Sequence, residues 1–429
     1  MKWKGTGLAL LGAAAVAGIA IGLSVGRGGG SKATTYVIAG AQTQESADTG
    51  GTTVADPSTA EPGHPLIVGT ADDSLKQADR AQADKLLRIS REAGFDAVLV
   101  SSTWTPGASA PTAAERRSLA NVVHAAGREG MGVFVFVWHG LSRSTPRTPA
   151  ARSQFASYSA ALARAFPRVR AVVVGNEPNL NTFWMPQYGP GGSDAAASGY
   201  LDLLTRTYDA VKAVSPRTQV IGGALAPRGS DRPQLPRDTH SPTQFIKDLA
   251  AVYRASGRTK PVMDSLAMHP YMRASAFPPS GVHPDSTTIT LGDYPRLAAL
   301  LARAFAGTAQ RGRGLPIYYT EFGVQTQVPD DHRRAYTNPT TPAAADAVDP
   351  ETQVRYYREA LSLAACQPTV KGLFVFHTFD EPDLAGWQSG LYYADHQPKP
   401  SLDGFRAAAT AARKGFLTRC AGDTFLRSG

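Results

Sequence analysis

From residue 64 onward, β-prone stretches alternate with helix-like stretches in eight rounds. The strand-like stretches are 65–70, 96–101, 132–138, 171–175, 219–224, 262–269, 317–321 and 370–376. The helix-like stretches that follow them are 75–93, 112–129, 150–166, 195–214, 243–256, 294–310, 351–365 and 402–416. Eight such units predict an α/β fold, a (β/α)8 TIM barrel. A doubly wound sheet would have a Gly-rich turn after its first strand, and Gly69-Thr70-Ala71-Asp72-Asp73 is not one.

The longest insertions all follow predicted strands, the fourth to the seventh: 184–194, 226–240, 271–292 and 324–350. In a parallel barrel, the loops that follow the strands all lie at the same end. We therefore expect these enlarged loops to form the walls of a binding cleft.

Two of the predicted strands end in a glutamate. The fourth strand is uniformly apolar, as in a strand covered on both faces, and leads into Gly175-Asn176-Glu177-Pro178. The seventh leads into Tyr319-Thr320-Glu321-Phe322-Gly323. Pro178 stops its strand and favours an extended backbone at Glu177. One glutamate at a strand end is commonly a capping or ion-pairing residue, but two at one end of a barrel indicate paired carboxylates. Glu381, near the end of the eighth strand, is a further candidate.

Four of the five tryptophans fall at or just beyond strand ends: Trp104, Trp138, Trp184 and Trp387. A flat aromatic face at the rim of a cleft is suited to stacking on the apolar face of a sugar ring. We expect all four to contribute to carbohydrate binding. The alternative for each is that it only packs against the top of the barrel.

Histidines also end predicted strands: His139 the third, His269 the sixth and His377 the eighth. A histidine in such a place most often makes hydrogen bonds, although three together are able to ligate a metal. No HxH or HExxH spacing accompanies them. We therefore predict that they line the substrate site, and we expect neither a metal nor a cofactor.

These motifs together resemble the clan A glycoside hydrolases, the retaining (β/α)8 enzymes that include families 5 and 39. The resemblance covers residues 64–416. It is carried by the two glutamate motifs, by His269-Pro270-Tyr271 after the sixth strand, and by Gly390-Leu391 and Lys399-Pro400 after the eighth.

The resemblance implies that Glu177 is the acid/base and Glu321 the nucleophile of a retaining O-glycoside hydrolase. It also implies that Asn176 binds the sugar hydroxyl next to the anomeric centre, that Tyr271 is a hydrogen-bond partner of the nucleophile, and that His269 lines the same subsite. Burial and the second carboxylate should raise the pKa of Glu177, and donors such as Tyr271 should lower that of Glu321. The alternatives are a transglycosylase with the same carboxylates and a non-catalytic carbohydrate-binding or wall-associated barrel.

Two departures from the family pattern indicate an unusual substrate subsite. Many members have an aromatic floor residue, often Trp, at the end of strand eight. Here that strand carries His377 and Phe379, and Trp387 comes several residues later. An arginine common near the end of strand two is also missing from Ser101-Ser102-Thr103-Trp104.

The N-terminal residues have the pattern of an export signal. Lys2 and Lys4 precede an apolar run from residue 8 to 25, and Arg27 follows it. We predict that residues 1–27 are a signal peptide or signal-anchor, with a possible membrane tether through 5–26. Residues 28–63 are rich in Gly, Ser, Thr, Ala and Pro and predict a disordered linker before the catalytic domain 64–429.

Export predicts an extracellular protein, either secreted or anchored to the outer face of the cytoplasmic membrane. The net charge of +9 is spread along the chain, so we expect a carbohydrate and not a nucleic acid as partner. The two cysteines, Cys366 and Cys420, have neither metal-binding nor redox spacing. In an oxidising compartment we expect them to form a disulfide, and two buried thiols are the alternative.

Overall fold

The computed structural model describes residues 61–233 and 238–420. Eight parallel strands close a barrel in chain order, as the alternation predicts. They are β2 (Ile67–Ala71), β3 (Ala97–Thr103), β4 (Gly132–Trp138), β5 (Val169–Val174), β6 (Gln219–Leu225), β7 (Ser265–Met268), β8 (Ile317–Phe322) and β9 (Val370–Phe376). The first predicted strand is thus β2 and the eighth is β9.

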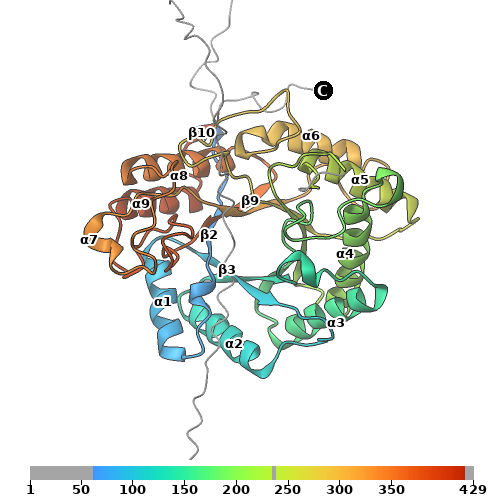
Figure 1. Cartoon of the computed structure of the whole chain (residues 1–429), viewed down its shortest axis with the longest axis horizontal. Coiled ribbons are helices and arrows are strands. Elements are labelled where there is room, and N and C mark those ends of the chain that lie inside the picture. Colours follow the sequence, from blue (N-terminus) through green and yellow to red (C-terminus); the bar gives the residue numbers. More distant parts are fainter. Residues whose placement is uncertain (1–60, 234–237, 421–429) are drawn as a thin grey trace, which may run out of the picture.

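A ring of helices surrounds the barrel, following the chain around it (Figure 1). The helices that connect or follow the strands are α1 (Arg80–Glu92), α2 (Ala113–Arg128), α3 (Pro149–Ala165), α4 (Ala195–Val214), α5 (Pro242–Ala255), α6 (Tyr294–Ala304), α8 (Pro350–Ala365) and α9 (Leu402–Arg413). A short helix, α7 (Asp330–Arg333), lies within the long loop after β8. The (β/α)8 prediction is confirmed.

Capping residues set where several helices begin. The three pairs Thr148-Pro149, Ser241-Pro242 and Asp349-Pro350 each place a side-chain acceptor at the N-cap and proline at the first helical position. Each of these acceptors binds a backbone N–H in the first turn, and proline needs no partner there because it has no N–H. The main error in boundaries is at the sixth unit, where β7 and α6 are shorter than predicted.

The core has two layers, one between strands and helices and one inside the barrel. Large aromatic rings fill the interior, including Phe134, Tyr318 and Phe374. Gly69 lies opposite Phe374 on the neighbouring strand, and a Cβ atom on Gly69 would lie 2.2 Å from that ring. The glycine therefore makes room for the ring, which gives a filled interior and not a pore.

The last residues of the predicted linker are structured, which corrects the boundary at residue 63. Strand β1 (Glu61–Pro62) pairs in antiparallel fashion with β10 (Arg419–Cys420). The backbone N–H groups of Gly63 and His64 donate to Thr418 and Ala365. Sequence reasoning missed this pairing because two-residue strands have no periodicity.

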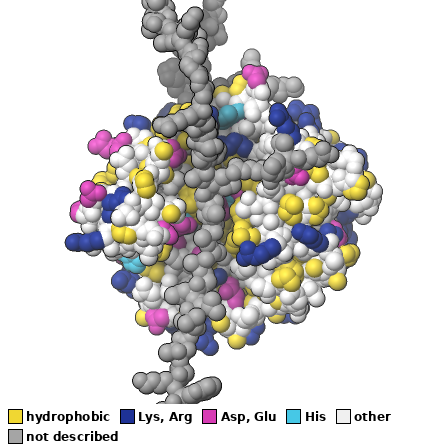
Figure 2. Space-filling model, viewed as in Figure 1, with side chains coloured by type: hydrophobic (Ala, Val, Ile, Leu, Met, Phe, Trp, Pro, Cys, Tyr) yellow, Lys and Arg dark blue, Asp and Glu magenta, His cyan; other side chains and the backbone are white. Residues whose placement is uncertain are grey.

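The predicted signal segment, and most of the predicted linker, lie outside the described residues. Within 61–233 and 238–420, no helix has the length and apolar character needed to cross a bilayer. Figure 2 shows basic side chains scattered over the visible face and interspersed with acidic ones, in agreement with a dispersed net charge.

The predicted disulfide is present between Cys366, at the end of α8, and Cys420 in β10. It ties the segment after α9 to the body of the barrel across 54 residues of sequence. We expect Cys420→Ser to lower the free energy of unfolding by about 2 to 4 kcal/mol, because the unfolded chain gains freedom. Urea unfolding of oxidised protein measures this, and wild type plus reductant should match the variant. Identical midpoints for wild type and variant would contradict the expectation.

Candidate active site

Glu177 and Glu321 meet at one histidine. Nδ1 of His269, which follows β7, lies 3.0 Å from Oε1 of Glu177 and 3.5 Å from Oε2 of Glu321. The imidazole is completely buried, whereas the glutamate side chains keep 14% and 20% of their surface exposed. Because both oxygens neighbour the same nitrogen, they are at most 6.5 Å apart, the sum of 3.0 and 3.5 Å. The structure thus forms a pair of solvent-reachable carboxylates from strand ends that are distant in sequence.

The backbone at Glu177 is not extended, contrary to the expectation from Pro178. Glu177 has a φ of 38°, in the left-handed region that non-glycine residues rarely adopt. Its N–H donates to the carbonyl of Ala224 on β6, 2.9 Å away. Tertiary contacts therefore override the local bias of the residue before proline. Strain of this kind is typical of functional sites.

Tyr200 of α4 fixes the two strand ends beneath this turn. Its buried hydroxyl donates to the carbonyl of Val174 and accepts the N–H of Gly223, both at 2.7 Å. Gly175, with a φ of 75°, passes close over the ring, and a Cβ there would lie 3.2 Å from it. The end of β5 is thus held against β6, and this holds Glu177 in place.

Tyr271 is the hydrogen-bond partner of Glu321 that the resemblance implies. Its hydroxyl donates to Oε2 of Glu321 at 3.2 Å. The indole of Trp387 lies beside it, with ring centroids 5.2 Å apart. The chain after β9 therefore returns a tryptophan to the mouth of the barrel, even though that residue comes several positions later than the floor residue of the family pattern.

The electrostatics of Glu321 differ from the sequence expectation. Burial raises the pKa of Glu321, and the negative charge of Glu177 raises it further. The side chains of His269 and Tyr271 lower the same pKa, but by less, so the pKa is raised overall. Burial alone would lower the pKa of His269, but the two carboxylates together outweigh it and raise that pKa. The donors at Glu321 are thus insufficient to hold its pKa down, because the carboxylate has lost most of its water.

Two further predicted residues present polar atoms without a partner among the described residues. Oδ1 of Asn176 is one, and the Nε1 of Trp138 is the other. Trp138 belongs to the cluster inside the barrel, where it packs against Phe136 and Phe183. A buried donor and a buried acceptor left unpaired near strand ends are suited to binding a polar ligand.

Three predicted substrate-binding residues lie away from the paired carboxylates, on the outer side of the barrel. Trp104 and Trp184 are 1% and 2% exposed and belong to the core between strands and helices. His139 packs edge-on against Trp184, and burial lowers its pKa to about 4. For His139 the reason is the alternation of side chains along a strand, because Trp138 points into the barrel and the next residue points out.

His377 and Glu381 form a separate pair near the end of β9. Nε2 of His377 is 3.9 Å from Oε1 of Glu381, and the other oxygen of Glu381 accepts the N–H of Trp387. The charge of His377 also lowers the pKa of Glu321, which places this histidine near the site. Glu381 therefore has a structural role, because it binds the backbone of the loop that carries Trp387.

A buried ion pair that the sequence did not reveal holds the same loop. The side chains of Lys399 and Asp380 are both 0% exposed, with Nζ 2.7 Å from Oδ1. Nζ also donates to Thr326 and to the carbonyl of Gln388, and Tyr336 donates to the second oxygen of Asp380. Lys399-Pro400, a motif of the resemblance, thus has a structural role in this chain.

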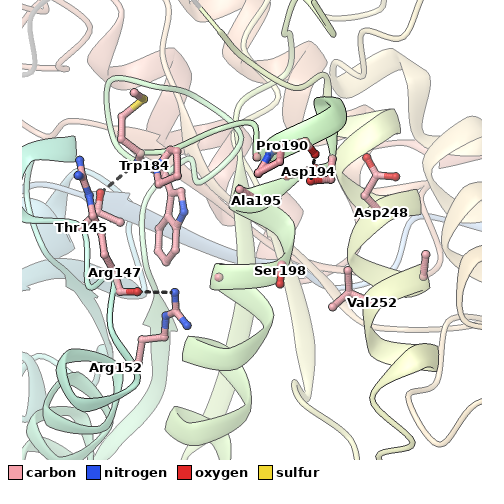
Figure 3. A pocket seen from close by; sticks show the side chains of 16 residues that line it. Thr145, Arg147, Arg152, Trp184, Pro190, Asp194, Ala195, Ser198, Asp248 and Val252 are labelled. Atoms are coloured by element: carbon pink, nitrogen blue, oxygen red, sulfur yellow. Dashed lines mark hydrogen bonds between the residues drawn. The ribbon is translucent and has the colours of Figure 1, made fainter. Parts of the chain in front are cut away.

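A cavity of about 590 Å³ lies on the flank of the barrel, away from the glutamates. Figure 3 shows Trp184 and Arg152 on one side of it and Asp194 and Asp248 on the other. Asp194, Asp248 and the nearby His240 offer donor atoms within 4.8 Å of one another, the one such group in the described parts of the chain.

Asp194, one of the two acids of that group, has a capping role. It is the N-cap of α4, and its Oδ1 accepts the N–H of Ala197. Burial, and then the Asp248 carboxylate, raises the pKa of Asp194 to about 7, so a proton is able to neutralise it near that pH. Asp194 thus has a structural role at the start of α4.

Comparison with solved structures finds the same barrel in glycoside hydrolases. A family 39 glycoside hydrolase from the gut symbiont Bacteroides cellulosilyticus WH2 has a TM-score of 0.57 and 20% identity, covering 82% of this chain and 64% of that one. A GH5_18 protein of Streptomyces cattleya in complex with GlcNAc has a TM-score of 0.52 and 19% identity, covering 82% and 81%. A family 1 β-glucosidase from Thermotoga maritima has a TM-score of 0.52 and 13% identity, covering 83% and 99%.

These identities establish a shared fold, in the two families that the sequence resembles and in a third. The chain spans 64% of the length of the family 39 structure. No protein-family model matches the sequence, and a search of curated proteins finds no match.

Proposed function

We propose that this protein is a retaining O-glycoside hydrolase that acts on an oligo- or polysaccharide. The observation that carries the proposal is the meeting of Glu177 and Glu321 at one buried imidazole, with oxygens at most 6.5 Å apart. Carboxyl groups of retaining glycosidases are roughly 5 to 5.5 Å apart, whereas inverting pairs are roughly 6.5 to 9.5 Å apart to admit water. The glycosidases that share this barrel give further support.

In the proposed reaction, the Glu321 carboxylate attacks the anomeric carbon while Glu177 donates its proton to the departing glycosidic oxygen. The old C–O bond breaks, and a glycosyl ester forms on Glu321. Glu177, now ionised, takes a proton from water as the water oxygen attacks the anomeric carbon. The ester breaks and both side chains return to their starting states.

The residues around the pair have defined roles in this proposal. His269 lies between the two carboxylates and fixes their relative position. Tyr271 orients Glu321 through its hydroxyl. The unpaired Oδ1 of Asn176 accepts a hydrogen bond from a sugar hydroxyl, and Trp387 presents an aromatic face beside the site. The loss of water around Glu321 strengthens all these interactions.

The test is to incubate the full chain with a panel of aryl 2-deoxy-2-fluoroglycosides and to digest it for mass spectrometry. We expect one of these sugars to become attached to Glu321, and no attachment in Glu321→Gln. Proton NMR of the first product from a cleaved aryl glycoside should show retained anomeric configuration. Inverted configuration, or attachment to Glu381, would contradict the proposal. Transfer to an added alcohol separates hydrolysis from transglycosylation.

A pH dependence follows from the raised pKa of Glu321. The nucleophile must be ionised, so kcat/KM falls as the pH falls through the pKa of Glu321. Because that pKa is raised, we expect the acidic limb of the pH profile to lie above pH 4.5, the ordinary pKa of a glutamate side chain. Tyr271→Phe removes a donor that lowers the pKa of Glu321, so the limb should move to higher pH. Tyr208→Phe on the outer helix α4 is the control. An unmoved limb in Tyr271→Phe would be evidence against this coupling.

We also propose that the protein is exported, as residues 1–27 predict. The Cys366–Cys420 disulfide supports this, because disulfides persist mainly in oxidising compartments. Fractionation of cells that express the full chain tests it. Recovery in the cytosol with two free thiols would overturn the proposal.

A further inference from the structure

Arg228 is a shielded cation without a counter-ion in the described parts of the chain. Its Nη1 is buried and has no hydrogen-bond partner, and its Nη2 makes only a long contact of 3.4 Å to the carbonyl of Met272. Burial lowers the pKa of Arg228, and the guanidinium of the exposed Arg273 lowers it further, whereas the Glu177 carboxylate raises it. Arginines are rarely shielded from water unless they are paired.

The position of Arg228 is fixed by its loop. Asn179, in the turn after Glu177, is fully buried and exchanges two hydrogen bonds with the backbone of Ala226, at 3.0 and 3.2 Å. The carbonyl of Pro227 accepts the N–H of Ile289 at 2.9 Å. The backbone that carries Arg228 is therefore held in place, and this limits where its guanidinium can lie.

This loop lies on the Glu177 side of the site. Arg228 comes three residues after the end of β6, and the N–H of Glu177 is bonded to that strand at Ala224. The Met272 carbonyl that Arg228 contacts follows Tyr271, the partner of Glu321. The arginine thus lies between the loops after β6 and β7, beside the residue that faces the departing sugar in the proposed mechanism.

We propose that Arg228, together with Arg273, binds an acidic substituent of the sugar on the leaving-group side, so that the substrate is an acidic glycan. This inference rests on the proposed function for the direction of the sugar. A carboxylate or sulfate would supply the acceptors that the guanidinium lacks, in the forked geometry that arginine favours. When a neutral sugar is bound, the Arg228 guanidinium would have no partner. A binding site that leaves one of its buried polar groups without a partner discriminates strongly against that ligand.

The test measures binding to the full chain carrying Glu321→Gln, so that no ligand is cleaved. The probes are oligosaccharides of alginate, polygalacturonate and hyaluronan, each compared with its methyl ester, and chondroitin sulfate compared with desulfated chondroitin. The esters remove the negative charge of each carboxyl group and add one methyl group. We expect at least one acidic oligosaccharide to bind about tenfold or more tightly than its matched form, in which the carboxylate is esterified or the sulfate removed. The uronate and sulfate pairs distinguish the two kinds of acid.

Arg228→Gln, added to this background, should bring the preference below about threefold, and Arg228→Lys should keep part of it. The matched control is Arg217→Gln, an exposed arginine before β6 at the opposite end of the barrel, which should keep the full preference. Equal affinities for acid and ester across the panel would overturn the inference, as would equal effects of Arg228→Gln and Arg217→Gln.

Thermal unfolding gives a second readout. Since Arg228 has no described acidic partner, Arg228→Gln should unfold at the same temperature as the parent or higher. A large fall in that temperature would show a structural role and overturn the inference. Failure of the proposed function would be seen separately, as lack of covalent labelling at Glu321 in the chain with the native nucleophile.

Discussion

Glu321→Gln is expected to lower glycosidase activity by about four orders of magnitude or more on every substrate, because no glycosyl ester can form without the carboxylate. Glu177→Ala should behave differently. It loses proton donation to the departing oxygen, so it should fail on poor leaving groups but still form the ester from activated aryl glycosides. Added azide should then release the sugar as a glycosyl azide, since azide needs no general base.

The control for this pair is Glu381→Gln, a third glutamate near a strand end. It contacts His377 and the Trp387 backbone and is separate from the paired carboxylates, so it should keep most of the activity. The measurement is kcat/KM over a series of aryl glycosides with different leaving groups. If Glu177→Ala and Glu321→Gln lost activity equally on all of them, or if Glu381→Gln were inactive, the assignment of roles would be wrong.

The largest stability effect is expected at Asp380. Asp380→Ala leaves the fully buried ammonium of Lys399 without a counter-ion, which should lower the free energy of unfolding by about 3 to 5 kcal/mol. Asp380→Leu combined with Lys399→Met removes both charges and should be less destabilising than Asp380→Leu alone or Lys399→Met alone. Urea unfolding followed by circular dichroism gives the four values of this cycle.

The exposed pair Arg406 and Asp403 provides the control, since its side chains are 43% and 88% exposed. Asp403→Ala should change the stability by less than about 1 kcal/mol, because water screens the pair. A small effect of Asp380→Ala, similar to that of Asp403→Ala, would show that water reaches Lys399. The active site is linked to this pair, because Lys399 also binds the carbonyl of Gln388, next to Trp387.

The tryptophans show where sequence reasoning stops being informative. All four lie at or beyond strand ends, but only Trp138 and Trp387 lie toward the interior and mouth of the barrel. Trp104 and Trp184 are in the outer core. A position at a strand end predicts the depth of a residue along the barrel axis. Which side of the sheet the residue faces changes with a shift of one position along the strand. Beyond the end of the strand this alternation no longer applies, so the sequence does not predict the side.

Arg228 gave no sequence signal, because a lone arginine in a long loop is usually solvated. Its significance depends on Asn179 and Met272, which belong to other loops. The Asp380–Lys399 pair likewise joins residues whose burial no local pattern indicates.

The sequence by itself determined the eightfold alternation, the end of the barrel at which the polar residues gather, and the two glutamates that end strands four and seven. These follow from local periodicity and from the parallel direction of the strands, which require no knowledge of distant contacts. Only the tertiary structure decided that both carboxylates meet at His269, that Glu177 adopts a left-handed backbone, and that burial raises the pKa of Glu321. Distances across the barrel and the loss of water around a charge arise from packing between segments far apart in the chain, and no window of sequence contains that information.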